Sequence, residues 1–415
     1  MPRTYLGPSA RCRDTDVFIA LVRRSERRGM APPAMLAGDW FGVSAVIAPS
    51  VALHRVPLDQ FMVPEHLDSP PTDVVVGGGV VGSIDYPGPR EAPRAYQCEV
   101  DEVLVLDDMG WWYETLSGTG DIAEMSDLLH TAHFHSREPW IAEWVMPDRL
   151  RHVAAVKACI GAIAQGEIFQ ACIGSMYTAS FSGRAADFFA DGLDATRPAK
   201  AAYMHSPPGA VASLSPELYL ARYRALVTTS PIKGTLPIEQ DPAHLRNSEK
   251  DIAENIMIVD MVRNDLGRVA DIGSVRPRRL LDIEAAPAVW HLVSTVEAIV
   301  SESVSNARLI EAIFPPPSVT GAPKIRAHQL IAEWEGADRG IYCGALGFCS
   351  PVAGLDMSVA IRTVEFSRDA TRCRLGVGGG ITADSNPERE WQECLTKASS
   401  IVHLSSSARS MGQAS

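Results

Sequence analysis

The sequence has no unbroken run of 18 apolar residues, and its N-terminal arginines are not followed by the apolar h-region of a signal peptide. The first absence argues against a transmembrane helix, and the second argues against a secretory signal peptide. The chain also has no basic stripe, and its formal net charge is −12. Nucleic acids and anionic membranes require a positive surface. We therefore expect a cytoplasmic protein that binds neither nucleic acid nor membrane.

The eight cysteines include no Cys-x-x-Cys pair. This spacing excludes the common zinc sites and a dense disulfide framework. Reduced, mostly buried thiols are the expectation. The composition, with 46% hydrophobic and 21% charged residues, is that of an ordinary globular protein with a large core.

Glycine is concentrated in Val74–Gly82, where Gly77-Gly78-Gly79 interrupts valines. The spacing matches neither the Rossmann nor the P-loop pattern, so it predicts a sharp turn between strands. Residues 1 to about 38 mix arginine, serine and proline, and predict a loosely held extension. We place the main boundary near Met146, which separates an N-terminal structural region (1–145) from the rest (146–404), and we expect a disordered tail over 405–415.

Helices are predicted wherever apolar residues recur at helical spacing behind a capping residue. The predicted segments are 148–163, 248–267, 305–313, 324–335 and 386–402. Strands are predicted over 41–47, 103–106, 171–177, 341–349, 355–363 and 372–377.

Lys233 stands between Pro231 and Gly234, in a turn predicted after a strand hairpin that covers residues 211–229. Such a turn can fix an amine in a cleft, and Glu217 lies just before the other arm of the hairpin. A lysine in a Pro/Gly turn is also commonly only a solvated loop residue. The residues alone leave both interpretations open.

Five long motifs occur in order over the C-terminal two thirds of the chain: Leu214-Ser-Pro-Glu217, Pro231-Ile-Lys-Gly-Thr235, Ala253-Glu-Asn255 continuing to Arg268, Ser318-Val-Thr-Gly-Ala-Pro-Lys324, and Gly378-Gly-Gly-Ile381 with Ala383-Asp-Ser385. Together they resemble the chorismate-utilising enzymes, and within them the component I group of aminodeoxychorismate synthases. The related anthranilate synthases carry alanine where Lys233 stands. The resemblance implies an α+β fold, with two facing antiparallel β-sheets flanked by helices and an active-site cleft between them.

The same resemblance implies the chemistry of the site in residues 146–404. The implied catalytic residues are Lys233 as the nucleophile toward carbon 2 of chorismate, Glu217 as the general acid, and His291. Substrate contacts are implied for Gln170, Thr320, Gly321, Arg362, Gly378, Gly379, Gly380 and Lys397. Mg²⁺ is the implied cofactor, with Glu254 and Glu393 as ligands and Asp251 and Glu390 beside them.

Several of these residues also have plainer interpretations. Glu390, Glu393 and Lys397 lie three and four apart on a predicted helix, as in many solvated surface stripes. Gln170 and His291 could also be ordinary core residues whose polar atoms are hydrogen-bonded within the protein. A side-chain amide at position 170 cannot deprotonate water, which favours ammonia as the nucleophile in this family.

No cysteine lies in a glycine-flanked elbow of the kind that holds a glutaminase nucleophile. The family resemblance therefore implies a separate glutamine amidotransferase subunit as the source of ammonia. Residues 1–100 contain no Leu-Leu-Glu-Ser motif, so feedback inhibition by tryptophan is not expected. Three alternatives remain: an anthranilate synthase, an aminodeoxyisochorismate synthase, or a non-catalytic scaffold for the glutaminase.

Overall fold

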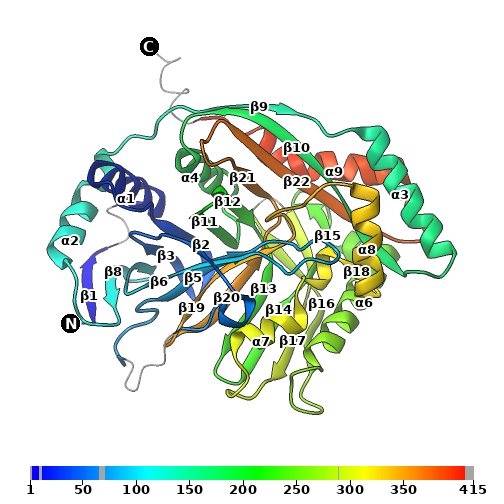
Figure 1. Ribbon diagram of the computed structural model, residues 1–415, viewed down its shortest axis with the longest axis horizontal. Helices are drawn as coiled ribbons and strands as arrows, with labels where there is room; N and C mark the ends of the chain where they lie inside the picture. Colours follow the sequence, from blue (N-terminus) through cyan, green and yellow to red (C-terminus); the bar gives the residue numbers. More distant parts are fainter. Residues whose placement is uncertain (1, 9–11, 65–70, 288, 407–415) are drawn as a thin grey trace.

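Two large antiparallel sheets form the centre of the computed structural model, which describes residues 2–8, 12–64, 71–287 and 289–406 (Figure 1). The first sheet contains, in spatial order, β1 (Arg3–Gly7), β8 (Gly110–Thr115), β7 (Glu102–Asp107), β3 (Val43–Ala48), β2 (Ala34–Trp40), β11 (Lys200–Ser206), β12 (Gly209–Ser215), β21 (Thr363–Phe366), β22 (Arg372–Ile381), β10 (Gln170–Ser182) and β18 (Gly321–Ala322), with β9 (Ile141–Val145) beside β10.

The second sheet contains β15 (Ile232–Pro237), β17 (Val289–Ile299), β14 (Leu226–Ser230), β13 (Leu218–Tyr223), β20 (Gly354–Val359), β19 (Ala345–Ser350), β5 (Gly79–Ile84), β6 (Ala95–Val100) and β4 (His54–Val56), with β16 (Arg276–Ala286) beside β17. The predicted fold of two antiparallel sheets with flanking helices is confirmed. Each sheet contains strands from the predicted N-terminal region (1–145) and strands from the predicted C-terminal part (146–404).

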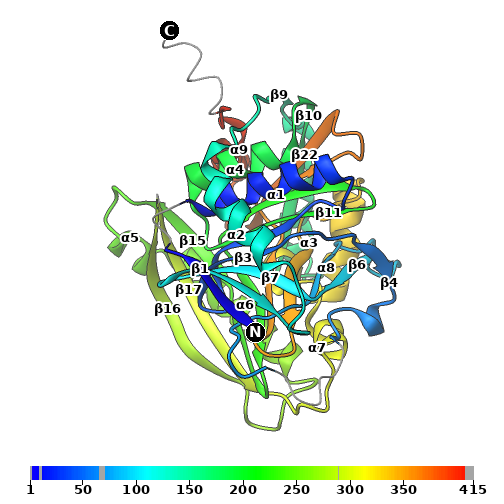
Figure 2. The same ribbon diagram turned by 90° about the vertical axis from the view of Figure 1, so that its left-hand side faces the viewer.

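The helices cover the outer faces of the two sheets. They are α1 (Asp14–Arg28), α2 (Ile122–Thr131), α3 (Arg149–Ala164), α4 (Ala185–Thr196), α5 (Ala243–Arg246), α6 (Glu249–Leu266), α7 (Asn306–Ile313), α8 (Lys324–Glu335) and α9 (Pro387–Val402), with short 3₁₀ turns at Leu58–Gln60, Ala132–Phe134 and Pro317–Val319. Figures 1 and 2 show α1, α4 and α9 along the upper side and α6 and α7 below. None of the helices in the described part of the chain combines the length and hydropathy needed to cross a lipid bilayer.

Four apolar clusters fill the spaces between these layers. One lies between the first sheet and α1, α4 and α9, one between the two sheets, one between the second sheet and α6 and α7, and one between β10 and the helices α3 and α8. Burial of these faces is the main driving force for the fold. The stack is therefore helix, sheet, sheet, helix.

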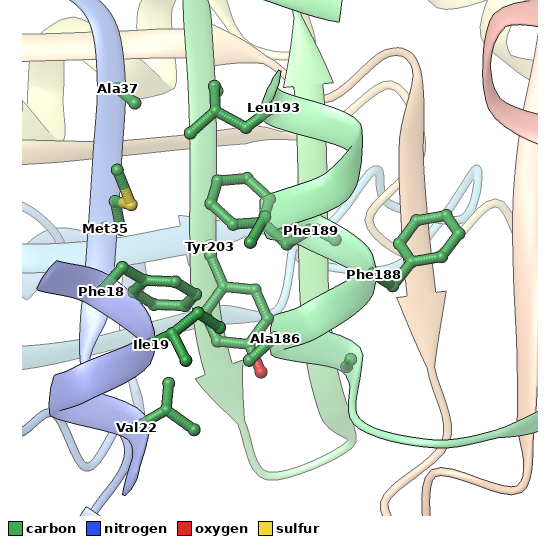
Figure 3. Packing of buried hydrophobic residues seen from close by; sticks show 14 of the residues in the cluster. Phe18, Ile19, Val22, Met35, Ala37, Ala186, Phe188, Phe189, Leu193 and Tyr203 are labelled. Carbon is green, nitrogen blue, oxygen red and sulfur yellow. The ribbon is translucent and has the colours of Figure 1, made fainter. Parts of the chain in front are cut away.

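The expectation of a loose extension over residues 1–38 is wrong, as far as those residues are described. α1 is a regular helix that ends at Gly29 in the left-handed conformation. Its apolar side packs into the first cluster, where Phe18 contacts Phe189 and Tyr203 edge to face (Figure 3). Arg23, Arg24 and Arg28 of this helix form ion pairs with glutamates elsewhere in the chain. The high frequency of arginine therefore hid an amphipathic helix. Residues 407–415 of the predicted tail lie outside the described residues.

The predicted hairpin over residues 211–229 is not formed as one unit. β12 belongs to the first sheet and β13 to the second, so the chain passes from one sheet to the other at Pro216 and Glu217. The strand predicted over 355–363 is likewise broken, because β20 ends at Val359 and β21 begins in the other sheet. At these two crossovers the chain passes directly from one sheet to the other.

Candidate active site

The two crossovers lie side by side and hold Glu217 and Arg362. The amide of Val359 donates to the carbonyl of Glu217 at 3.1 Å, and the amide of Leu214 donates to the carbonyl of Arg362 at 3.0 Å. Arg362 has a positive φ of 50°, a strained conformation for a side chain of its size. Its guanidinium forms no hydrogen bond or ion pair with any described residue, and burial lowers its pKa. A free, partly desolvated guanidinium is suited to clamp a carboxylate.

Glu217 is buried, and burial raises the pKa of its carboxyl to about 7. Hydrogen bonds from Ser318 and from the Ile232 backbone, together with the charge of Lys233, oppose this rise. A carboxyl group that titrates near neutral pH is well matched to proton transfer.

Lys233 lies on strand β15 and not in a turn, which corrects the prediction from sequence. The register between β15 and β17 shifts between Ile232 and Thr235, and Gly234 has a φ of +84°. Such a bulge re-aims the side chain beside it. The Lys233 side chain is 11% exposed, and its amine donates to the carbonyl of Ser318 at 2.9 Å and lies 4.0 Å from Glu254 Oε2. The solvated-loop interpretation is therefore wrong.

Three glycines of β22 form the floor of the site. A Cβ atom at Gly380 would lie 2.9 Å from Glu254 Oε2 and 3.3 Å from the Lys233 amine. A Cβ atom at Gly379 would lie 3.4 Å from Glu393 Oε1 and 3.5 Å from Glu390 Oε2. The bare backbone of β22 thus lets side chains from α6, β15 and α9 approach one point.

Gly380→Ala should therefore lower turnover by about 100-fold, because displacing a reacting group by a fraction of an ångström has effects of that order. The melting temperature should change little, since the new methyl group meets ends of side chains. Steady-state kinetics and thermal denaturation measure the two effects. The matched control is Gly161→Ala in α3, where a Cβ atom would meet nothing within 4 Å. Equal activity of both variants would contradict this geometry.

The four predicted metal ligands come from two helices. Glu254 and Glu390 are buried, whereas Glu393 is half-exposed and paired with Lys397 at 2.7 Å. Burial raises the pKa of Glu254, and the charges of Glu393 and Asp251 add to the rise. Burial alone would raise the pKa of Glu393. The charge and hydrogen bond of Lys397 outweigh this effect, so the pKa of Glu393 is lowered. The burial of Glu390 rules out a wholly solvated stripe on α9.

The four carboxylates lie in one region but do not converge. Among the described residues, no group of three or more histidine, cysteine, aspartate or glutamate side chains is arranged to hold a metal ion. Two buried oxygens, Glu254 Oε1 and Glu390 Oε2, nevertheless have no hydrogen-bond partner in the part of the chain that the structure describes. Carboxylate oxygens left without donors fit a hard cation such as Mg²⁺.

Other buried polar atoms in the site are also without partners. Both atoms of the Gln170 amide and Nε2 of His291 make no hydrogen bond within the described part of the chain. The other ring nitrogen of His291 lies 3.0 Å from the Thr235 hydroxyl, and burial, followed by the charge of Arg362, lowers the His291 pKa to about 4. A neutral histidine and an amide with open positions are more consistent with ligand contacts than with satisfied core residues.

The remaining predicted residues occupy the edge of the site. Thr320 donates its hydroxyl to the Pro316 carbonyl, and a Cβ atom at Gly321 would lie 2.5 Å from the Gln170 carbonyl. Lys397 donates to the Gly378 carbonyl at 2.9 Å. Its ion pair with Glu393 raises the Lys397 pKa despite burial. Four cations, Lys233, Lys250, Arg362 and Lys397, therefore gather in an acidic protein, as an anionic ligand requires.

Sequence reasoning missed Lys250, Ser318 and Ser385. Lys250 Nζ lies 2.8 Å from Glu390 Oε1, and the Ser385 hydroxyl donates to the same oxygen at 2.7 Å. Ser318 and Ser385 stood within the quoted motifs. Lys250 stands four residues before Glu254, a spacing that also describes many surface ion pairs.

Residues 112–403 match the sequence profile of a family described as chorismate binding enzymes. The chain belongs to this family. Aminodeoxychorismate synthase component 1 of Salmonella typhimurium is 42% identical over 245 residues, which is 57% of this chain and 54% of that protein. Anthranilate synthase component 1 of Streptomyces coelicolor is 35% identical over 277 residues, or 65% of this chain and 53% of that protein. The chain thus matches about half the length of these relatives.

Solved structures agree in fold. Anthranilate synthase component I from Streptococcus pneumoniae superposes with a TM-score of 0.70 at 23% identity, covering 90% of this chain and 91% of that one. The menaquinone-specific isochorismate synthase from Escherichia coli gives a TM-score of 0.71 at 18% identity, covering 96% and 92%. The architecture of this chorismate-binding enzyme is therefore the one implied by its motifs.

Proposed function

We propose that this chorismate-binding enzyme is an aminodeoxychorismate synthase component I, which replaces the 4-hydroxyl of chorismate with an amino group. The position of Lys233 carries the proposal, because its amine lies in the site between Ser318 and Glu254. Relatives from Salmonella typhimurium and Streptomyces griseus that are named aminodeoxychorismate synthase, at 42% and 40% identity, support the same reaction. The product, 4-amino-4-deoxychorismate, would serve 4-aminobenzoate and folate biosynthesis.

The reaction proceeds in two displacements. The Lys233 amine forms a bond to ring carbon 2, the double bonds shift, and the bond from carbon 4 to its hydroxyl breaks. Glu217 gives its proton to the departing oxygen, which leaves as water. Ammonia then bonds to carbon 4 and expels the lysine from carbon 2, so that two easier steps replace one difficult displacement.

Charged and polar groups position the substrate for this attack. Arg362 and Lys397, with the backbone of Gly378–Gly380, bind carboxylates of chorismate. Glu254 and Glu393 would hold Mg²⁺, with Asp251 and Glu390 beside them. When bound, the ion would neutralise the ring carboxylate.

Gln170 and His291 face the departing hydroxyl and the incoming ammonia. The unpaired amide of Gln170 can orient ammonia but cannot deprotonate water, which supports amination over hydration. The free Nε2 of the neutral His291 ring is available to the leaving hydroxyl, and Thr320 and Gly321 line the same edge.

Ammonia comes from a separate glutaminase subunit. The relatives are named component 1, which supports a second component. Seven of the eight cysteines are buried and the eighth is half-buried, so none resembles an accessible glutaminase nucleophile. All eight are free thiols, which is consistent with a reducing cytoplasm.

Product identification tests the function. The protein is incubated with chorismate, Mg²⁺ and ¹⁵N-ammonium, and the products are separated and identified by mass spectrometry. We expect 4-amino-4-deoxychorismate carrying one ¹⁵N. Anthranilate, recognised by mass and fluorescence, would instead favour the anthranilate synthase alternative. Unchanged chorismate would favour the scaffold alternative.

Glu254→Gln should weaken Mg²⁺ binding by about tenfold or more, because it removes the charge of a direct ligand. Isothermal titration with Mg²⁺ measures the change. Glu249→Gln is the matched control, since Glu249 is exposed on the same helix. Identical titrations of the two variants would exclude Glu254 as a ligand.

A further inference from the structure

Lys250 lies between the two acidic helices of the site. It projects from α6, and its amine is 2.8 Å from Glu390 Oε1 on α9 and 3.8 Å from Glu254 Oε1 on α6. The two carboxylates are 4% and 7% exposed, whereas the lysine side chain is 37% exposed. The ammonium group therefore reaches the buried carboxylates from the protein surface, on a flexible stem.

The carboxylates keep oxygens that this lysine does not satisfy. Glu254 Oε1 lies beyond hydrogen-bond distance of Lys250, and Glu390 Oε2 has no partner among the described residues. A buried carboxylate oxygen without a donor is unfavourable. These two carboxylates could therefore bind a cation of higher charge than one ammonium group.

We infer that Lys250 is an internal counter-ion, which holds α6 and α9 together before a divalent cation binds and must leave Glu390 when that cation arrives. The inference rests on the proposed function only in its use of a divalent cation. Ammonium and metal ion compete for the same carboxylates, because each needs their negative charge. This competition explains why the acidic residues gather without forming a converged metal site.

Removal of the competitor should strengthen metal binding. Mg²⁺ is titrated calorimetrically into the full chain without chorismate, and Mn²⁺ binding is followed by electron paramagnetic resonance. For Lys250→Met we expect affinity to rise about tenfold, which corresponds to about 1.4 kcal/mol. Lys250→Arg keeps the charge and should stay close to the wild type.

The control for net charge is Lys157→Met on α3. Lys157 is exposed and forms no ion pair with the described residues, so this variant should bind metal as the wild type does. If Lys250→Met does not fold, Lys250→Gln removes the charge while keeping a donor. In EDTA, either Lys250 variant should melt below the wild type, and saturating Mg²⁺ should remove the difference.

The outcomes separate this inference from the proposed function. If Lys250→Met and Lys250→Gln bind metal no more tightly than a wild type that binds it normally, the counter-ion role alone is overturned. Absence of metal binding in all variants and in the wild type would overturn both this role and the proposed Mg²⁺ site.

Discussion

Lys233→Ala should lower formation of the 4-amino product by at least about 10³-fold, because it removes the proposed nucleophile. The remaining turnover, if any, should give anthranilate, since direct addition of ammonia at carbon 2 needs no lysine. Rates with chorismate, Mg²⁺ and ammonium, resolved by product, measure both effects.

Lys233→Arg separates nucleophilic attack from simple charge. Arginine keeps the positive charge beside Glu254 but is not a comparable nucleophile, because it stays protonated. It should be as inactive as the alanine variant in making the 4-amino product. Substantial activity of the arginine variant would show that position 233 acts only through its charge.

Glu217→Gln should lower kcat by about 10²–10⁴-fold, the usual contribution of a positioned general acid. The wild type should lose activity as pH rises through about 7, because the required protonated form of Glu217 then disappears. Rates measured over this pH range test the assignment. Glu99→Gln, at an exposed position of β6, is the matched control and should keep the wild-type profile. A wild-type profile in Glu217→Gln would exclude the acid role.

The stability contribution of Glu217 should fall over the same rise in pH. The folded-state pKa of Glu217 is raised from 4.5 to about 7, so the folded protein binds more protons than the unfolded chain within that window. Its stability contribution therefore falls as pH rises from 4.5 through 7. The Glu217→Gln variant has no carboxyl group at this position and does not lose this stability. The stability of the variant minus that of the wild type should therefore be larger at pH 8 than at pH 5. Thermal denaturation at the two pH values measures the difference.

Much of the fold was predictable wherever local chemistry determines it. Asp148, Ser248 and Asn386 each accept hydrogen bonds from the first turn of a helix, and those helices begin where expected. The sheet membership of β12 and β13 was not predictable, because strands in either sheet have the same period. The sheet to which a strand belongs depends on partners far away in the sequence.

The sequence motifs predicted some residues of the candidate site, but the prediction left out others. The long motifs indicated Glu217, Lys233 and the glycines of β22 together. Lys250 was missed, because its partner Glu390 stands 140 residues away and no local pattern joins them. The bulge that aims Lys233 was also missed, since the register between β15 and β17 depends on their pairing.

The covalent attachment of Lys233 to the substrate is the central claim, and peptide mapping tests it most directly. The enzyme is mixed with chorismate and Mg²⁺, with or without ammonium, quenched in acid during the reaction, and digested for mass spectrometry. We predict that the peptide containing Lys233 gains the mass of chorismate less one water, and that added ammonium decreases this species. Formation of the 4-amino product while Lys233 remains unmodified at every time point would contradict the account.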